Sequence, residues 1–244
     1  MRIENKFLKR GVKYFTYLVL FLLIVNIPFL LYLMSFRLII FDETIHKSEF
    51  KKYGIYEKFP DEDIDKINSA VLDYFKYEEK NIAISNDFFN EKEKTHLIDV
   101  KLLVRLALFS LYIGLLMLFL KFLLLVILVR YQKEDLLNYS SFMLAVSGIL
   151  TIIPTLLLLF VMKINFNLAF TFFHLISFNN DLWLLDPAVD SLVVIYPEGF
   201  FYDMAIKIVL AALIQALALV IIGISLYKIR KRFKNKETIS KKII

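Results

Sequence analysis

Four long apolar runs, almost free of charged residues, constrain this chain more than any other feature of its sequence. Three of the runs contain no charged residue, and the remaining one contains only Arg105 and Lys121. An α-helix needs about 20 apolar residues to cross the roughly 30 Å hydrocarbon core of a bilayer. We therefore predict an all-α integral membrane protein with four transmembrane helices. The predicted spans are about residues 14–37, 102–129, 137–162 and 206–228.

The composition supports this class of protein and excludes several others. Hydrophobic residues make up 59% of the chain, whereas soluble domains contain roughly 45–50%. The chain has no Cys, which excludes disulfides, thiolate zinc sites and a cysteine nucleophile. Its net charge of +6 comes from the chain ends beside apolar runs, so the charge does not indicate nucleic-acid binding.

Basic residues flank the four runs unevenly, and this bias predicts an orientation. They are dense before the first run, in the turn between the second and third runs, and after the fourth run. The segment between the third and fourth runs has only Lys163 before Lys207. Because short loops rich in Lys and Arg stay in the cytoplasm, we predict a multi-pass protein of the cell membrane with both termini cytoplasmic. The two longer segments, and any active site in them, then lie at the outer face.

The two outer segments are predicted to cap a single membrane domain that comprises residues 1–244. They cover residues 38–101 and 163–205. Residues 36–59 could supply short strands, although their register is not visible in the sequence. The cap would therefore combine an amphipathic helix with a few short strands.

Two stretches of the outer segments have a helical pattern. Apolar residues recur at helical spacing between Ile64 and Phe75, which predicts an amphipathic helix docked on the membrane surface or on the other outer segment. Residues 168–176 are more apolar than an aqueous loop should be, so we expect a re-entrant or interfacial helix there. Asp186 and the Pro that follows it have the pattern of a helix start.

His96 and His174 come from distant parts of the chain, yet the predicted topology brings both to the outer face. Two imidazoles at a similar bilayer depth can act as general base and general acid near neutral pH, so we predict that both are catalytic. The alternative is that each is an interfacial histidine bonded to a backbone carbonyl. His46 lies in a charged stretch and is expected to be solvated.

Several residues of the outer segments could support such a pair. Asp99 lies one helical turn after His96 and could orient it. The second segment offers three polar candidates for orienting His174 or donating to an oxyanion, although caps and turns explain them equally well: Asp181, Asp186 and Asn179. Aromatic residues of the same segment could form a substrate wall or an interfacial belt; they are Trp183, Phe170, Phe173 and Phe178.

Other kinds of chemistry have little support in the sequence. A metal site could use His46, His96, Asp99 and His174, but no HExxH or similar compact ligand motif is present, and we predict no metal and no cofactor. There is also no GxSxG elbow, phosphate-binding loop or dinucleotide fingerprint. Without a Cys or an elbow Ser, the chain lacks an obvious covalent nucleophile. An enzyme of this kind would activate a nucleophile that belongs to its substrate.

Three stretches of the chain together resemble one known family. They are THLIDVK before the second run, FFHLISFNNDLWLLDP in the second outer segment, and VDSLVVIYPEGFF before the fourth run. With four spans and both termini inside, they are similar to the integral membrane lipoprotein intramolecular transacylases of low-GC Gram-positive bacteria. The resemblance covers most of the chain and is weakest in residues 38–92.

This resemblance implies an acyltransferase whose partners are diacylglyceryl-modified lipoproteins and bilayer lipid. The sn-2 acyl chain would move from a glycerol oxygen to the α-amine of the N-terminal cysteine and leave a lyso-form lipoprotein. The two histidines to which the family's catalysis is assigned match His96 and His174 here. We expect a monomer. The sequence leaves two other possibilities open, a metal-dependent membrane hydrolase and a non-enzymatic receptor or lipid-binding scaffold.

Overall fold

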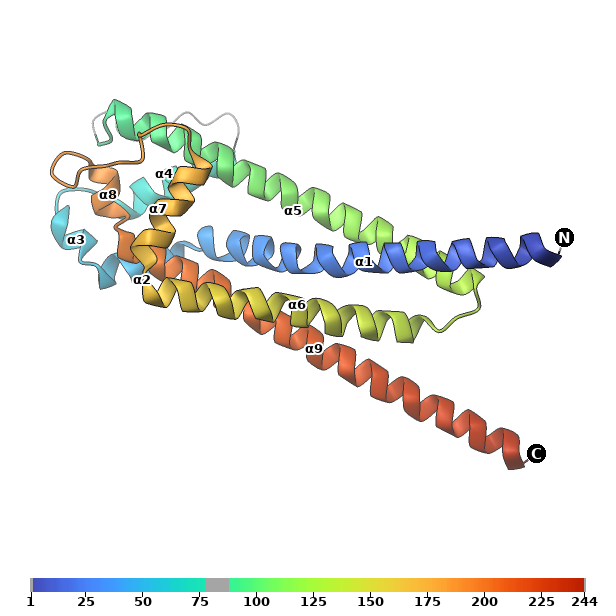
Figure 1. Ribbon diagram of the computed structural model, residues 1–244. Helices are drawn as coiled ribbons and strands as arrows, with labels where there is room; N and C mark the ends of the chain where they lie inside the picture. Colours follow the sequence, from blue (N-terminus) through green and yellow to red (C-terminus); the bar gives the residue numbers. More distant parts are fainter. Residues whose placement is uncertain (1, 78–87, 244) are drawn as a thin grey trace. The chain divides into compact units, whose positions relative to one another are not determined.

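Long helices dominate the computed structural model, which describes residues 2–77 and 88–243. Residues 78–87 of the predicted first outer segment lie outside the described residues. The helices long and apolar enough to cross a membrane are α1 (Arg2–Ile40), α5 (Glu91–Tyr131), α6 (Leu136–Ile164) and α9 (Glu198–Ile243), as Figure 1 shows. The described residues contain no strand, which confirms the prediction of an all-α membrane protein with four transmembrane helices.

α5 begins well before the predicted second span. Its first residue is Glu91, so His96 lies in its second turn. No Gly or Pro occurs between Glu91 and Gly114 to interrupt the helix. His96 is therefore carried by a helix that continues without a break into an apolar span, and its position is fixed by that helix.

The stretch in which we predicted short strands is helical, so that prediction is wrong. It forms α2 (Glu43–Lys52) and α3 (Ile55–Lys58). The carboxylate of Asp42 caps α2 by accepting two backbone N–H groups of its first turn. The side chains that α2 buries then follow at helical spacing, and they are His46, Glu49 and Phe50. This cap and this helical spacing of buried residues explain why the stretch is helical.

Three further short helices complete the outer segments. The predicted amphipathic helix is confirmed as α4 (Ile64–Lys76), and the predicted apolar helix of the second segment as α7 (Phe166–Ser177). α8 (Ser191–Ile195) starts later than predicted. Asp186 does not begin a helix, because its carboxylate accepts the Ala188 N–H and closes a turn instead.

By its contacts the chain divides into two compact units, each of which we describe by itself. The first comprises residues 1–32, 111–156 and 210–244; the second comprises residues 33–110 and 157–209. That the whole chain is one membrane domain with an outer cap stays a prediction.

The core of the first unit is made by α1, α5 and α6. Its fully buried side chains include Leu23, Leu125 and Val129. Polar groups inside this unit are paired between helices: Lys121 Nζ donates to Asn26 Oδ1 at 3.0 Å, and Tyr32 Oη lies 2.6 Å from Thr155 Oγ1. Many apolar side chains on the outer faces of these helices are exposed, as expected for surfaces that contact lipid.

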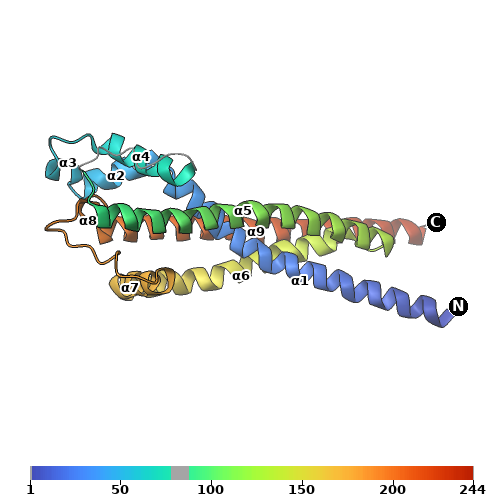
Figure 2. The ribbon, with the colours of Figure 1, turned by 90° about the horizontal axis from the view of Figure 1, so that it is seen from above.

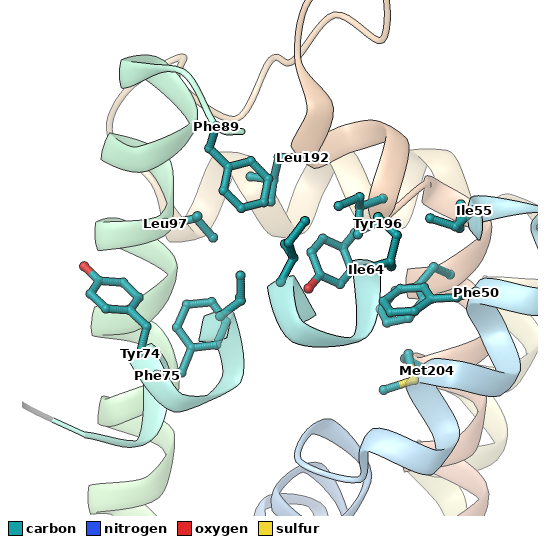
Figure 3. Packing of buried hydrophobic residues seen from close by; sticks show 14 of the residues in the cluster. Phe50, Ile55, Ile64, Tyr74, Phe75, Phe89, Leu97, Leu192, Tyr196 and Met204 are labelled. Carbon is teal, nitrogen blue, oxygen red and sulfur yellow. The ribbon is translucent and has the colours of Figure 1, made fainter. Parts of the chain in front are cut away.

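The core of the second unit joins the two outer segments. In both ribbon views α2, α3, α4 and α8 gather at the ends of α5 and α9 that belong to this unit (Figures 1 and 2). Figure 3 shows side chains of α2, α4, α5, α8 and α9 meeting in one cluster, among them Phe50, Phe75, Leu97, Leu192 and Met204. We predicted that α4 docks either on the membrane surface or on the other outer segment. Its buried face contacts the other outer segment.

Candidate active site

The N-terminus of α5, one turn before His96, is held by a reciprocal pair of hydrogen bonds. Asn90 Oδ1 accepts the Glu93 N–H at 3.0 Å, and Glu93 Oε2 accepts the Asn90 N–H at 2.6 Å. This is the capping-box arrangement, in which two helix-end N–H groups are satisfied at once. It explains why the helix starts here and fixes the turn that leads to His96.

The same turn is bonded to the second outer segment. Glu93 Oε1 accepts the backbone N–H of Leu192 at 2.5 Å, and Asp190 Oδ1 accepts from Asn90 Nδ2 at 2.7 Å. Glu93 and Asp190 are both almost completely buried. Burial alone would raise the pKa of Asp190, but hydrogen bonds from the Asp186 N–H and Asn90, together with Lys92, hold that pKa below its usual value. Burial raises the pKa of Glu93, against the hydrogen bonds from the Leu192 and Asn90 N–H groups. Asn90, Lys92, Glu93 and Asp190, which we call the latch, thus join α5 to the start of α8.

His174 is positioned by α7 and by the contacts of α7 with α9. Asn165 caps α7 by accepting the Leu168 N–H at 3.0 Å. On the same side of α7 as His174, Phe166 packs on Tyr202 and Phe170 on Phe201, with ring centroids 5.1 and 5.2 Å apart. The opposite face of α7 is exposed and apolar, as expected for an interfacial helix.

The two histidines lie side by side. Their ring centroids are 6.3 Å apart and their planes differ by 28°. Both are buried, with 6% of His96 and 7% of His174 exposed. Phe178 packs against both rings, at 5.1 Å from His96 and 5.7 Å from His174. The structure therefore brings together the pair that sequence analysis selected.

Hydrogen bonding assigns the tautomer of His174. Its Nδ1 lies 2.7 Å from the carbonyl oxygen of Phe170, and a carbonyl can only accept, so Nδ1 carries the hydrogen. The neutral ring then has its lone pair on Nε2. Burial lowers the pKa of His174 below its usual value, although the hydrogen bond to Phe170 opposes this shift. His174 is thus a neutral imidazole with a free basic nitrogen at neutral pH.

His96 has an unused polar atom. Its Nδ1 is buried and has no hydrogen-bond partner among the described residues. A buried polar atom without a partner is costly, and such atoms in a native fold call for an explanation such as a catalytic role. Since His174 lies beside it, this nitrogen is available to a group bound between the rings.

The loop that follows α7 is clamped to α5 on both sides of His96. Asn180 Nδ2 donates to Asp99 Oδ2 at 2.9 Å, and Lys92 Nζ donates to the carbonyl oxygen of Leu184 at 2.6 Å. Between these two points Trp183 packs on His174, with ring centroids 4.9 Å apart. The loop therefore places an aromatic side chain against His174.

The other predicted site residues have varied positions. Phe170 and Phe173 lie 4.3 and 5.4 Å from the His174 ring by centroid distance. Asp99 bonds the loop rather than a histidine ring, and Asp186 closes a turn. Asn179 and Asp181 are exposed, and within the described residues no side-chain contact brings either of them to the pair.

His46 is not solvated, so that expectation is wrong. It is 2% exposed because it lies on the buried face of α2. Its Nε2 donates to the Ile40 carbonyl at 3.0 Å, and its Nδ1 lies 2.8 Å from Asn68 Oδ1. Across residues 2–77 and 88–243, no three His, Cys, Asp or Glu side chains come together as a metal site would require.

Sequence analysis missed the latch residues Asn90, Lys92, Glu93 and Asp190. One signal for them was available, because Asn90 followed three residues later by Glu93 before an apolar run is the pattern of a capping box. The contact with Leu192 and Asp190 joins parts of the chain about 100 residues apart, and no local pattern predicts it.

The three buried histidines predict a stability that depends on pH. Burial lowers the pKa of His46 and of His174, against the hydrogen bonds that each makes, and burial together with the neighbouring His174 lowers the pKa of His96 to about 4. At pH values between the folded and the unfolded pKa, the unfolded chain binds more protons than the folded chain. The contribution of these groups to stability is therefore fully present above about pH 6.5 and is lost as the pH falls below it. We expect the thermal unfolding temperature to decrease from pH 7.5 to 5.5, with a smaller decrease for His174→Gln. Equal slopes for the variant and the wild type would contradict this.

The fold and the site together define an integral membrane protein of four long helices with two adjacent histidines on α5 and α7. The sequence model of the family described as lipoprotein intramolecular transacylase Lit matches residues 21–201. This match covers more than half of the chain, so the chain belongs to that family of membrane acyltransferases. The resemblance seen in the sequence is confirmed.

Solved structures of the integral membrane lipoprotein intramolecular transacylase Lit from Bacillus cereus have the same fold. One has a TM-score of 0.79 at 20% identity and covers 90% of this chain and 99% of its own. A variant of that protein with one histidine replaced by arginine has a TM-score of 0.75 at 20% identity, with 96% and 100% covered. Another variant, in which a histidine is replaced by alanine, has a TM-score of 0.74 at 19% identity and covers 90% of this chain and 97% of its own. No curated protein sequence matches the chain.

Proposed function

We propose that the chain catalyses an O-to-N acyl transfer within a diacylglyceryl lipoprotein. The α-amine of the N-terminal cysteine attacks the carbonyl carbon of the sn-2 ester, and the bond between that carbon and the glycerol oxygen breaks. The proton lost by the amine ends on the glycerol oxygen. The products are an amide at the N-terminus and a free sn-2 hydroxyl, so the atoms balance without water, metal or cofactor.

The pairing of His96 and His174 is the observation that carries this proposal. A ring nitrogen bonds an atom about 2.9 Å away, so two rings with centroids 6.3 Å apart can both reach one ester group. His174 Nε2 is the basic nitrogen, and it takes the proton of the attacking amine. An α-amine has an unperturbed pKa of about 7.7–8.0, within reach of an imidazole base.

His96 acts on the other reactant in this proposal. Its unpartnered Nδ1 donates to the ester carbonyl oxygen, where negative charge develops as the amine attacks. A donor already placed at that oxygen stabilises the transition state without reorganising at the moment of reaction. Because the ester and the amine belong to one molecule, holding them in attack geometry supplies up to about 7–11 kcal/mol more.

The surroundings of the pair fit an acylated substrate. Four aromatic rings surround His174 with apolar surface, and they belong to Trp183, Phe170, Phe173 and Phe178. Such a surface favours contact with an acyl chain over contact with water. The exposed apolar face of α7 would enter the outer leaflet. The substrate would then reach the histidines from the bilayer, and the enzyme would work as a monomer.

The proposed orientation can be tested with single cysteines, since the natural chain has none. Asp61 and Lys228 are both exposed, in the first outer segment and near the C-terminus respectively. In intact cells we expect a membrane-impermeant maleimide to label Asp61→Cys and to label Lys228→Cys only after permeabilisation. The reverse pattern would place the histidine pair at the cytoplasmic face and contradict the proposed orientation.

Incubation of the purified protein with a synthetic diacylglyceryl lipopeptide tests the reaction type. Mass spectrometry should detect an N-acyl lyso product of unchanged mass, identified by fragmentation, and a chelator should leave its rate unchanged. Release of free fatty acid that stops on chelation would indicate a metal-dependent hydrolase instead. Binding without any product would indicate a receptor or scaffold.

A further inference from the structure

A charged cavity lies in the first unit, between the α5–α6 turn and the C-terminal part of α9. Its volume is about 420 Å³, and it is lined by Lys133, Glu134, Asp135, Asn138, Tyr139, Arg230 and Lys234. Neither histidine of the candidate active site is among these residues. A cavity of this size is large enough for a small polar group such as a glycerophosphate.

The acidic side chains of the cavity are already paired. Glu134 accepts a hydrogen bond from Tyr139 Oη and forms an ion pair with Lys13 at 3.4 Å. Asp135 accepts from Arg230 Nε at 2.5 Å and from the Leu137 N–H at 3.0 Å. The negative charge of both carboxylates is thereby compensated. The lining has three basic side chains against two acidic ones, so its net charge is positive.

Lys133 supplies one of these positive charges from an unusual backbone position. Its φ of 58° makes it the one non-glycine residue with positive φ in the part of the chain that the structure describes. It follows the end of α5, where glycine or asparagine is preferred because most side chains clash with the backbone in the left-handed conformation. Its ammonium group has no hydrogen-bond or ion-pair partner among the described residues. The backbone here closes the end of α5, because the Glu134 N–H donates to the Val129 carbonyl and the Lys133 N–H donates to the Arg130 carbonyl. This C-cap accounts for the positive φ but not for a lysine side chain at the position.

Exposed apolar side chains lie close in sequence to the residues that line the cavity. Tyr131 and Leu137 lie on the α5–α6 side, and Ile229 and Phe233 lie on α9. Contact with such apolar surface would not strengthen the binding of free phosphate, whereas it would strengthen the binding of the glycerol and acyl parts of a phospholipid. The cavity also lies where the predicted spans end, and basic pockets between helices at that depth bind anionic lipid headgroups.

We propose that this cavity binds the phosphate group of an anionic phospholipid, with Lys133 as the lysine that contacts it. The occupant is a lipid of the leaflet that lies next to the basic ends of the spans. By the positive-inside rule, this leaflet is the cytoplasmic one. This site is separate from the acyl-transfer site and does not depend on the proposed reaction.

Native mass spectrometry of the purified full chain tests this proposal, with phosphatidylglycerol and phosphatidylcholine titrated in parallel. We expect tighter binding of phosphatidylglycerol to the wild type. Lys133→Gly should weaken that binding about fivefold, the effect of roughly one charge beside a phosphate, without changing phosphatidylcholine binding. This variant relieves the left-handed backbone, so it should fold at least as well as the wild type. Lys133→Arg should retain the affinity.

Lys228→Gln is the matched control, because it removes the same charge from α9 without lining the cavity. It should bind phosphatidylglycerol as the wild type does. Equal losses in Lys133→Gly and Lys228→Gln would overturn the proposal in favour of general surface charge. Equal binding of the two lipids to the wild type would also overturn it, as would complete displacement of phosphatidylglycerol by excess inorganic phosphate.

Discussion

Replacement of His174 by alanine is expected to lower the rate of acyl transfer by about 10²–10⁴-fold, the usual contribution of a general base. The residue supplies a neutral Nε2 because its Nδ1–H is committed to the Phe170 carbonyl. The loss should appear in kcat, since the proton leaves the amine only as the amine attacks. The measurement is the rate of lyso product formation from a diacylglyceryl lipopeptide, followed by mass spectrometry.

The matched control for His174→Ala is Leu175→Ala, which changes the adjacent, exposed side chain of α7. It should leave the rate within a few-fold of the wild type and should unfold at a similar temperature. His174→Ala with near-normal kcat would contradict the assignment of the base. A large loss in both variants would show that α7 itself, rather than the imidazole, had been disturbed.

Replacement of Glu93 by alanine should have the second largest effect, on stability and on activity together. The carboxylate is 1% exposed and accepts the N–H groups of Asn90 and Leu192. Each buried N–H left without a partner costs about 1–3 kcal/mol, so for two such groups we expect a loss of about 2–6 kcal/mol in unfolding free energy. The turn that carries His96 would lose its contact with α8, and kcat should fall as well. Thermal unfolding and lipopeptide turnover measure the two effects.

Glu91→Ala is the control for Glu93→Ala, because Glu91 lies in the same turn of α5 and is exposed. Its only described ion pair, with Lys94, is exposed and should contribute little. Glu93→Gln keeps an acceptor oxygen and should recover part of the lost stability. If Glu93→Ala unfolds and turns over as Glu91→Ala does, the latch has no role in positioning His96.

The sequence predicted the elements whose signals are local. Long uncharged runs gave the four spans, and the stripe from Ile64 to Phe75 gave α4. The histidine pair followed from topology and family resemblance rather than from any spacing, because His96 and His174 lie far apart in the chain. Their adjacency, with ring centroids 6.3 Å apart, emerges only when the two outer segments pack together.

What the sequence did not reveal depends on contacts between distant segments or on competition between patterns. His46 looked solvated because its neighbours are charged, yet the buried face of α2 places it between Asn68 and Ile40. Short strands were expected within residues 36–59, but the Asp42 cap and the helical spacing of buried residues make the stretch helical. The bonds from Glu93 and Asp190 to the opposite segment have no signature in either segment alone.

The central claim is that one acyl chain moves from the sn-2 oxygen to the amine of the same molecule. The most direct test uses a lipopeptide with different acyl chains at sn-1 and sn-2, mixed with an equal amount of the same compound carrying an isotope-labelled peptide and labelled acyl chains. After incubation with the purified protein, fragmentation should find only the sn-2 chain on nitrogen, always with the label of its own peptide. N-acylation by the sn-1 chain, or products in which label is exchanged between the two populations, would contradict the claim.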